Sequence, residues 1–244
     1  MFDPDASAIA QFPNPFRMIA TFLRANEPFV MVNLLAYKAQ ATGEHRHLSG
    51  EAAYAKYVAS VEKVQGPMGS KLLWGGRSVR QRVGESPHGF VHFGLLQYAS
   101  PRTFLSFVAG NQGDHQARRD GLAGQWLFAS TTLESAQAPE TDHVALMEVF
   151  GFDDRRGQTS ADWRQRRQAA DEAAGAVRVW RGRIDRHVIG SSSPPLHEVV
   201  VTAYPTAEAI DAAFEQAGPP QGMRVWWAFE ADTTVDLLPG LREP

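Results

Sequence analysis

The sequence predicts an α+β fold in which two tandem βαββαβ units close on each other as an α/β-barrel. A phrase recurs, as "LLWGGRSVRQRVG" at residues 72–84 and as "RVWRGRIDRHVIG" at residues 178–190. The spacing of the repeated landmarks is constant, because 180 − 74 for the tryptophans and 204 − 98 for two tyrosines both give 106. The predicted strands and helices also follow the same order in both halves, which indicates an internal repeat.

Residues 1–28 are predicted to form a helical extension, because apolar residues from Phe16 to Leu23 recur at helical spacing. The first unit follows at residues 29–134. Its strands are expected at "FVMVNLLAY", at the first recurring phrase, at "FVHFGLLQY" and at "GQWLFAST". A helix with the apolar face of Tyr54, Tyr57, Val58, Val61 and Val64 follows the first strand, and "SPRTFLSFVAG" begins a second helix.

Residues 135–142, "SAQAPETD", have the small, polar and proline-bearing composition of a linker. The second unit at residues 143–244 then repeats the order, beginning with the strand "HVALMEVFGF" and ending with "MRVWWAFEA". Aligning the first strands pairs Asn33 with Glu148, at a distance of 115 residues rather than 106. The second unit therefore has a shorter loop before its first helix.

A four-stranded sheet with both helices on one face leaves its other face uncovered, and an apolar face must find a partner. Two such sheets in one chain can cover each other. We therefore expect an intramolecular ferredoxin-like pair, with the helices outside and a lumen between the sheets.

Composition places the chain among globular proteins, since 43% of its 244 residues are hydrophobic and 10% aromatic. A net charge of −3 without long single-sign runs argues against a nucleic-acid partner. The absence of cysteine excludes disulfides and thiolate chemistry, and no stretch is apolar for long enough to span a bilayer. Without a signal-peptide pattern at "MFDPDASAIA", we expect a cytoplasmic protein.

Four motifs of the first unit, "VMVNLLAYK", "AAYAKY", "LLWGG" and "YASPRTFLSFV…HQARRDGL", resemble an uncharacterised bacterial family, domain of unknown function 1330. That family belongs to the dimeric α/β-barrel, ferredoxin-like superfamily, and the chain resembles a tandem fusion of it. The resemblance covers residues 29–133 well and the second unit loosely. It implies a barrel that binds a small molecule, in a superfamily of cofactor-independent monooxygenases, isomerases, cyclases and haem-dependent enzymes. Family positions fall on Asn33, Tyr54, Trp74 and Arg119.

Strand alternation assigns candidate side chains to the lumen. Val30, Val32 and Leu34 are uniformly apolar and suit the helix-covered face, so Asn33 is expected to face inward. The same argument turns His92 and Tyr98 inward on the third strand, and Glu198 and Tyr204 inward on its counterpart. Asn33 would then oppose Glu148, and His92 would oppose Glu198.

These four residues are the candidate catalytic set, because ionisable groups in a partly dry cavity have shifted pKa values and can move protons. Glu148 or Glu198 is expected to be the base, His92 a second acid or base, and Asn33 an oxyanion partner. The alternative is structural: each carboxylate or imidazole is satisfied by a neighbouring arginine, with Arg77, Arg82, Arg181 or Arg183 as candidates.

Further candidates concern binding. Substrate contacts are expected from Tyr54, Tyr98, Tyr204 and Arg119, and from Trp74 and Trp180 unless these tryptophans belong to the core. His45 and His47 lie two residues apart, which could suit a metal site, but this spacing is weak evidence and no metal is expected.

The leading functional hypothesis is a small-molecule enzyme without cofactor, of isomerase, cyclase, lyase or oxygenase type, acting on an aromatic or polyketide-like substrate. One alternative is haem binding through His92 or His115. The other is a non-catalytic binding or assembly module. The sequence also leaves open which unit holds the site and whether the fused barrel forms a homodimer.

Overall fold

The structure is a computed structural model that describes residues 27–65, 68–109, 114–137, 142–154, 158–190 and 195–233. Apart from its last two positions, the predicted helical extension at residues 1–28 lies outside the described residues. Within these ranges, no helix is both long enough and apolar enough to cross a membrane.

The first unit has the predicted order, with one additional short helix before its last strand. Its elements are β1 (Phe29–Tyr37), the 3₁₀ turn η1 (Gly43–His45), α3 (Gly50–Gln65), β2 (Lys71–Val83), β3 (His92–Tyr98), α4 (Pro101–Ala109), α5 (His115–Gly121) and β4 (Leu122–Ser135). The second unit consists of β5 (Val144–Phe152), α6 (Ala161–Ala173), β6 (Val177–Ile189), β7 (Glu198–Tyr204), α7 (Ala207–Ala217) and β8 (Met223–Thr233).

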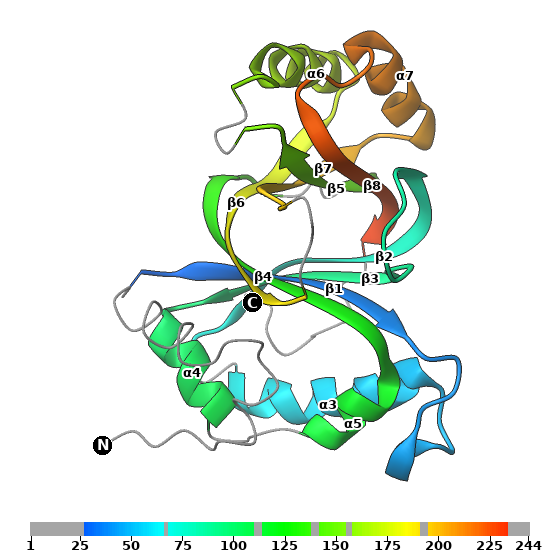
Figure 1. Ribbon diagram of the computed structural model, residues 1–244, viewed down its shortest axis with the longest axis vertical. Coiled ribbons are helices and arrows are strands. Elements are labelled where there is room, and N and C mark those ends of the chain that lie inside the picture. The colour runs from blue at the N-terminus through cyan, green and yellow to red at the C-terminus, as the bar shows by residue number, and fades with distance from the viewer. Residues whose placement is uncertain are drawn as a thin grey trace.

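The strands form one closed barrel in the order β1-β3-β2-β8-β5-β7-β6-β4. Two antiparallel seams join the units, β2 with β8 and β4 with β6. Helices α3, α4 and α5 lie on one side of the barrel, and α6 and α7 lie on the opposite side (Figure 1). The prediction of two tandem units that close into an intramolecular barrel is confirmed.

The two strand faces are the reverse of the prediction. Val30, Val32 and Leu34 are fully buried in the cluster that fills the barrel interior. Met31 and Leu35 pack against the helices instead, and in the second unit Val199, Val201 and Ala203 likewise point into the barrel. Both faces of each strand are buried, so apolar alternation alone does not tell them apart. The most uniformly apolar face fills the closed interior, while the helix-covered face admits polar groups.

The recurring phrase forms the seams of the barrel. Trp74 and Trp180 are 4% and 1% exposed and belong to the interior cluster. A Cβ atom on Gly76 or Gly182, two residues further on, would overlap the neighbouring indole ring. Each indole Nε1 donates to a threonine on the last strand of the other unit, Trp74 to Thr233 at 3.4 Å and Trp180 to Thr132 at 3.1 Å. The Trp-x-Gly pattern therefore occurs in both units because the tryptophan indole at each seam packs over the glycine two residues later, where a side chain would clash.

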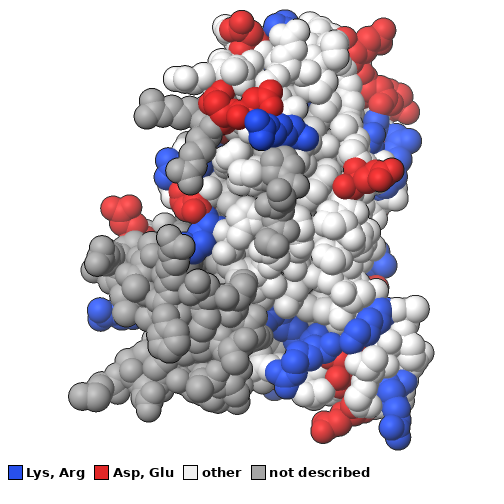
Figure 2. Space-filling view, in the orientation of Figure 1, with Lys and Arg blue, Asp and Glu red and all other residues white. Residues whose placement is uncertain are grey.

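The surface carries charges of both signs. On the face shown in Figure 2, Lys and Arg lie beside Asp and Glu at both helical ends of the molecule. This mixture agrees with the small net charge of −3, and the described residues on this face form no broad basic surface of the kind that nucleic-acid binding needs.

Candidate functional site

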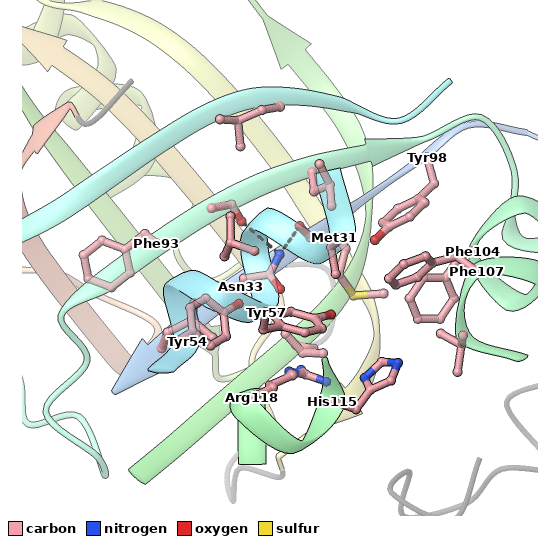
Figure 3. Close-up of a pocket in the computed structure, with 18 residues that line it drawn as sticks. Met31, Asn33, Tyr54, Tyr57, Phe93, Tyr98, Phe104, Phe107, His115 and Arg118 are labelled. Carbon is pink, nitrogen blue, oxygen red and sulfur yellow. Dashed lines mark hydrogen bonds between the residues drawn. The ribbon is translucent and has the colours of Figure 1, made fainter. Parts of the chain in front are cut away.

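A cavity lies between the first half of the barrel and helices α3, α4 and α5 (Figure 3). It offers about 90 Å³ to the centres of water-sized molecules, whereas a single water needs about 10–15 Å³. Its wall is largely apolar, and its aromatic side chains are Tyr54, Tyr57, Phe93, Tyr98, Phe104 and Phe107. Three polar side chains of a different kind also line it: Asn33, His115 and Arg118. An apolar pocket with a few convergent polar groups is the usual form of a small-molecule site.

His115 is the first residue of α5 and is 8% exposed. Its ring lies 5.6 Å from that of Tyr57 on α3. Neither ring nitrogen has a hydrogen-bond partner among the described residues. Burial, followed by the charges of Arg118 and Arg119, lowers the pKa of the imidazole below its usual 6.5. The ring is therefore neutral at pH 7, with a basic nitrogen available to a ligand.

Arg118 lies one turn further along α5 and is also 8% exposed. Its Nη2 donates to the amide oxygen of Gln125, and its guanidinium carbon lies 5.4 Å from the ring centre of Tyr57. Its Nε has no hydrogen-bond partner among the described residues. None of the ion pairs within the described ranges involves this arginine. Arg118 is thus a buried cation that contacts only neutral groups there.

Asn33 presents an acceptor to the cavity. Its Nδ2 donates to the backbone carbonyls of Met31 at 3.0 Å and Gly94 at 3.4 Å. Both donor hydrogens are directed at these carbonyls, and the amide oxygen points toward the cavity (Figure 3). The prediction that Asn33 holds an oxyanion is not supported by this geometry, because an oxyanion needs a donor.

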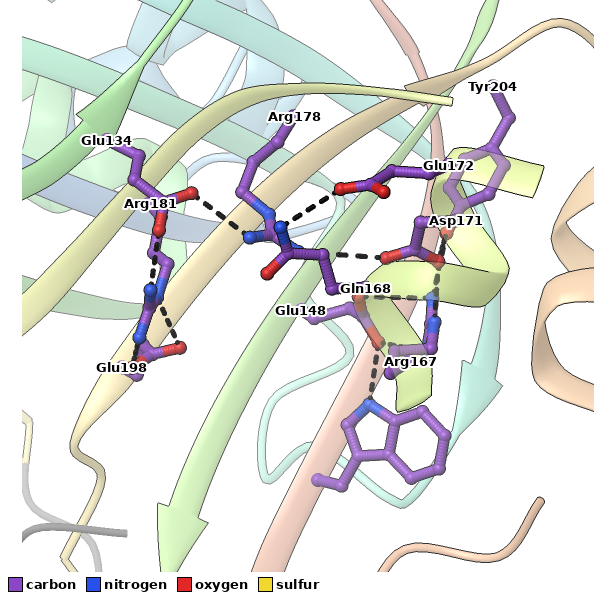
Figure 4. Close-up of polar contacts among 11 residues, drawn as sticks. Glu134, Glu148, Arg167, Gln168, Asp171, Glu172, Arg178, Arg181, Glu198 and Tyr204 are labelled. Atoms are coloured by element: carbon purple, nitrogen blue, oxygen red, sulfur yellow. Dashed lines mark hydrogen bonds and ion pairs between the residues drawn. The ribbon is translucent and has the colours of Figure 1, made fainter. Parts of the chain in front are cut away.

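The predicted base Glu148 lies in the second unit, beneath α6, rather than in a shared lumen. It is 2% exposed and receives hydrogen bonds from Arg167 at 3.1 and 3.3 Å and from Trp226 Nε1 at 3.0 Å. Arg167 also binds Asp171 and the hydroxyl of Tyr204, at 2.7 and 2.9 Å (Figure 4). Glu148 and Tyr204 are therefore brought together, but as members of a closed ionic network.

The other two predicted catalytic residues also have structural partners. Glu198 accepts hydrogen bonds from Nε and Nη2 of Arg181, at 2.9 and 3.1 Å (Figure 4). His92 contacts the Tyr37 hydroxyl through Nδ1 at 2.8 Å and Arg77 Nη1 through Nε2 at 3.1 Å. Both residues face the helix layers instead of the lumen, so the four catalytic candidates do not share a site. Arg77 and Arg181 are two of the arginines that the structural alternative named.

The predicted binding residues divide between the cavity and other regions. Tyr54 and Tyr98 line the cavity, and burial raises the pKa of the Tyr54 hydroxyl so that it stays protonated. Trp74 and Trp180 belong to the barrel interior. Arg119 is exposed and donates to Gln116 at 2.7 Å. The cavity is lined by its neighbour Arg118 instead.

The histidine-bearing loop after β1 serves the structure. His45 is buried and its Nδ1 lies 3.0 Å from Asp120 Oδ2, with Asp114 3.6 Å from its Nε2. In the described part of the chain, no three His, Asp or Glu side chains are arranged to hold a metal ion.

From the sequence alone, His115 is named only as an alternative haem ligand, and Arg118 is not selected. Arg118 and Arg119 follow His115 by three and four residues, and both spacings are compatible with one helix face. The packing of α5 against α3 selects Arg118, and this packing has no local signature in the sequence.

Comparison with known proteins supports the fold. No family model matches the sequence, and no curated protein matches it. Among solved structures, a mutant chlorite dismutase from Candidatus Nitrospira defluvii superposes with a TM-score of 0.53 at 10% identity, over 92% of this chain and 99% of that chain. A protein from Fusobacterium nucleatum, provisionally assigned as a monooxygenase, superposes with a TM-score of 0.50 at 12% identity, over 85% and 92%. The chain has the dimeric α/β-barrel fold.

A protein of unknown function from Rhodopseudomonas palustris is also similar, at 20% identity over 56% of this chain and 97% of that chain, with a TM-score of 0.42. The two superpositions with TM-scores of 0.53 and 0.50 support the fold alone, because their identities are only 10% and 12%, and they leave the activity to be argued from the site. Membership of the family of unknown function 1330 is not confirmed by any family match.

Proposed function

We propose that this dimeric α/β-barrel protein is a small-molecule enzyme whose active site is the cavity of the first unit, with His115 as its acid–base group. The observation that carries the proposal is a buried imidazole with both nitrogens unpartnered among the described residues, in an aromatic cavity. Its lowered pKa keeps the ring neutral near pH 7, which is the form that accepts a proton.

The proposed step is proton abstraction from a carbon acid. A ring nitrogen of His115 takes the proton, and the electron pair of the C–H bond becomes part of an enolate. The positive charge of Arg118 stabilises the negative charge of the enolate, and the return of the proton to a different atom completes an isomerisation without any oxidant. Cyclase, lyase and cofactor-free oxygenase reactions on aromatic or polyketide-like substrates begin with the same step.

This proposal replaces Glu148, Glu198 and His92 as proton-transfer groups, because each has structural partners outside the cavity. Asn33 keeps a binding role, but as a hydrogen-bond acceptor instead of a donor. Its amide oxygen would accept a hydrogen bond from a ligand hydroxyl or N–H group.

Deuterium exchange tests the proposal. Phenylpyruvate and phenylacetone each carry one aromatic ring beside an activated methylene group, and loss of the methylene signal in D₂O is followed by proton NMR. The full-length protein should accelerate exchange of at least one probe. A His115→Gln substitution should reduce the rate by about 100-fold or more, whereas His92→Gln, the matched control, should retain it. Equal exchange by wild type and His115→Gln, or no acceleration of either probe, would overturn the proposal.

Haem binding is the second hypothesis that involves these histidines. Of the two candidates for an axial ligand, His92 is engaged through both nitrogens, while neither nitrogen of His115 has a hydrogen-bond partner in the described part of the chain. The donor chemistry of His115 fits haem, but the space does not. The cavity of about 90 Å³ is smaller than the roughly 150 Å³ of an engineered cavity that admits benzene, and a porphyrin is several rings wide. We therefore expect no visible absorption band when haemin is added to the protein.

A further inference from the structure

The two units place different groups at the same position beneath their helices. Asn33 on β1 pairs with Gly94 on β3, and Glu148 on β5 pairs with Val200 on β7. The two strand partners, Gly94 and Val200, are 200 − 94 = 106 residues apart, which is the repeat spacing found along the chain. The structure therefore aligns Asn33 with Glu148, so a neutral amide in the first unit stands where the second unit has a carboxylate.

The second unit neutralises its own buried cation. Arg167 is 4% exposed and is held between the carboxylates of Glu148 and Asp171. The arginine therefore has two acidic partners, a tyrosine hydroxyl and the face of Phe214, 4.3 Å from the guanidinium carbon. The positive charge of Arg167 is therefore neutralised by side chains of the second unit itself.

The first unit has a buried cation without such partners. Arg118 is 8% exposed, yet its hydrogen-bond partner and its ring partner among the described residues, Gln125 and Tyr57, are both neutral. The two acids at its helix have other partners. Asp114 caps α5 through the Ala117 amide at 2.9 Å and lies 3.6 Å from His45, while Asp120 accepts a hydrogen bond from Gln116 at 2.7 Å and lies 3.0 Å from His45 Nδ1. Burying a charge without a partner of opposite sign costs several kcal/mol of folding free energy.

We infer that the first-unit cavity takes a small monoanionic ligand, whose carboxylate pairs with Arg118 in the way that Glu148 pairs with Arg167. The inference rests on the same cavity as the proposed function and adds the charge and size of its substrate. The carboxylate binds Arg118, a hydroxyl or N–H group of the ligand donates to Asn33, and the carbon skeleton lies among the aromatic side chains.

Gly94 sets the size of this ligand. A Cβ atom added to it would meet only the Asn33 Cβ, at 4.0 Å, so the missing side chain leaves open space in the cavity wall. The corresponding Val200 packs with Phe150 and Trp163 in the second unit. The first-unit cavity of about 90 Å³ is smaller than the roughly 150 Å³ of an engineered cavity that admits benzene, so one ring is the upper limit of ligand size and a fused polycycle does not fit.

Three ligands of nearly equal shape and different charge test the inference: benzoate, benzamide and benzamidine. Titration calorimetry at pH 7 with the full-length protein should show the tightest binding for benzoate, weaker binding for benzamide and none for benzamidine. Replacing Arg118 by Met should weaken benzoate binding by about 10- to 100-fold, the value of a hydrogen-bonded charge pair. The affinity for benzamide should change little, so the preference for the anion should disappear.

Matched variants separate a binding role from a folding role. Arg119→Met removes an exposed cation from the same helix and should leave both affinities unchanged. Gly94→Val should abolish binding of benzoate and benzamide while circular dichroism and the unfolding transition remain those of a folded protein. If Arg118→Met does not fold, Arg118→Lys should retain a weakened preference for benzoate.

Equal affinity for benzoate and benzamide in the wild type, or an unchanged preference in the Arg118 variants, would overturn the inference. So would the absence of binding by all three probes. These results are independent of the proton-transfer step, because binding needs no base. His115-dependent exchange of phenylacetone without a preference for phenylpyruvate would refute the anionic ligand and support the enzyme. Benzoate binding without exchange of either probe would support the anionic ligand and refute the proton-transfer reaction.

Discussion

Removing Arg167 is expected to destabilise the protein strongly, because its role is to neutralise two buried carboxylates. Glu148 and Asp171 are 2% and 6% exposed, and both hydrogen-bond to Arg167. Breaking a buried pair by removing one partner typically costs about 3–5 kcal/mol. For a protein of 150–250 residues, each kcal/mol lowers Tm by about 2–4 °C, so Arg167→Met should lower Tm by about 6–20 °C.

The assay is urea unfolding followed by tryptophan fluorescence, together with calorimetry, at pH 7 and pH 5. In Arg167→Met the Glu148 carboxyl group has lost its cation, and burial raises its folded pKa above the unfolded value. The folded state then binds more protons than the unfolded state, so the deficit should shrink as the pH falls. The double variant Glu148→Gln/Arg167→Met removes one charge of each sign and should lose less than the sum of the two single variants.

The matched control is Arg164→Met. This guanidinium lies 3.5 Å from Glu198, and its side chain is 27% exposed. Glu198 retains Arg181 in that variant, so the loss should stay within about 1 kcal/mol. A loss below about 1 kcal/mol for Arg167→Met, or its failure to bind benzoate while folded, would refute a purely structural role for the Glu148 network.

Three further outcomes follow from the structure. Gly182→Ala should cost about 1–3 kcal/mol in urea unfolding because its Cβ overlaps Trp180, and an unchanged midpoint would contradict the packing described for the seam. Tyr37→Phe removes the hydroxyl that contacts His92 and should cost about 1 kcal/mol of stability; a change in exchange activity instead would place His92 in the reaction. Exchange activity should fall on the acid side of neutrality as His115 protonates, at a pH below its usual 6.5 because burial and Arg118 lower its pKa, and His115→Gln should lack this acid limb.

The sequence alone determined the architecture. The repeat was identified because Trp74 and Trp180 are separated by the same number of residues as Tyr98 and Tyr204. The unpartnered apolar face of each sheet then required the two units to close on each other. These are properties of local pattern and of apolar area, which any fold of this chain must satisfy.

The tertiary structure alone decided the site. The alternation of side chains correctly placed Asn33 and Val32 on opposite faces of the strand. It did not show which face is the barrel interior, because both faces are buried and alternation is the same for either assignment. Likewise, His115, Arg118 and Arg119 share helix-compatible spacings, and only the packing of α5 against α3 and the sheet turns Arg118 into the cavity. The partners of Glu148 come from helix α6 and strand β8, distant in sequence, so its neutralisation was a matter of long-range contacts that no local pattern encodes.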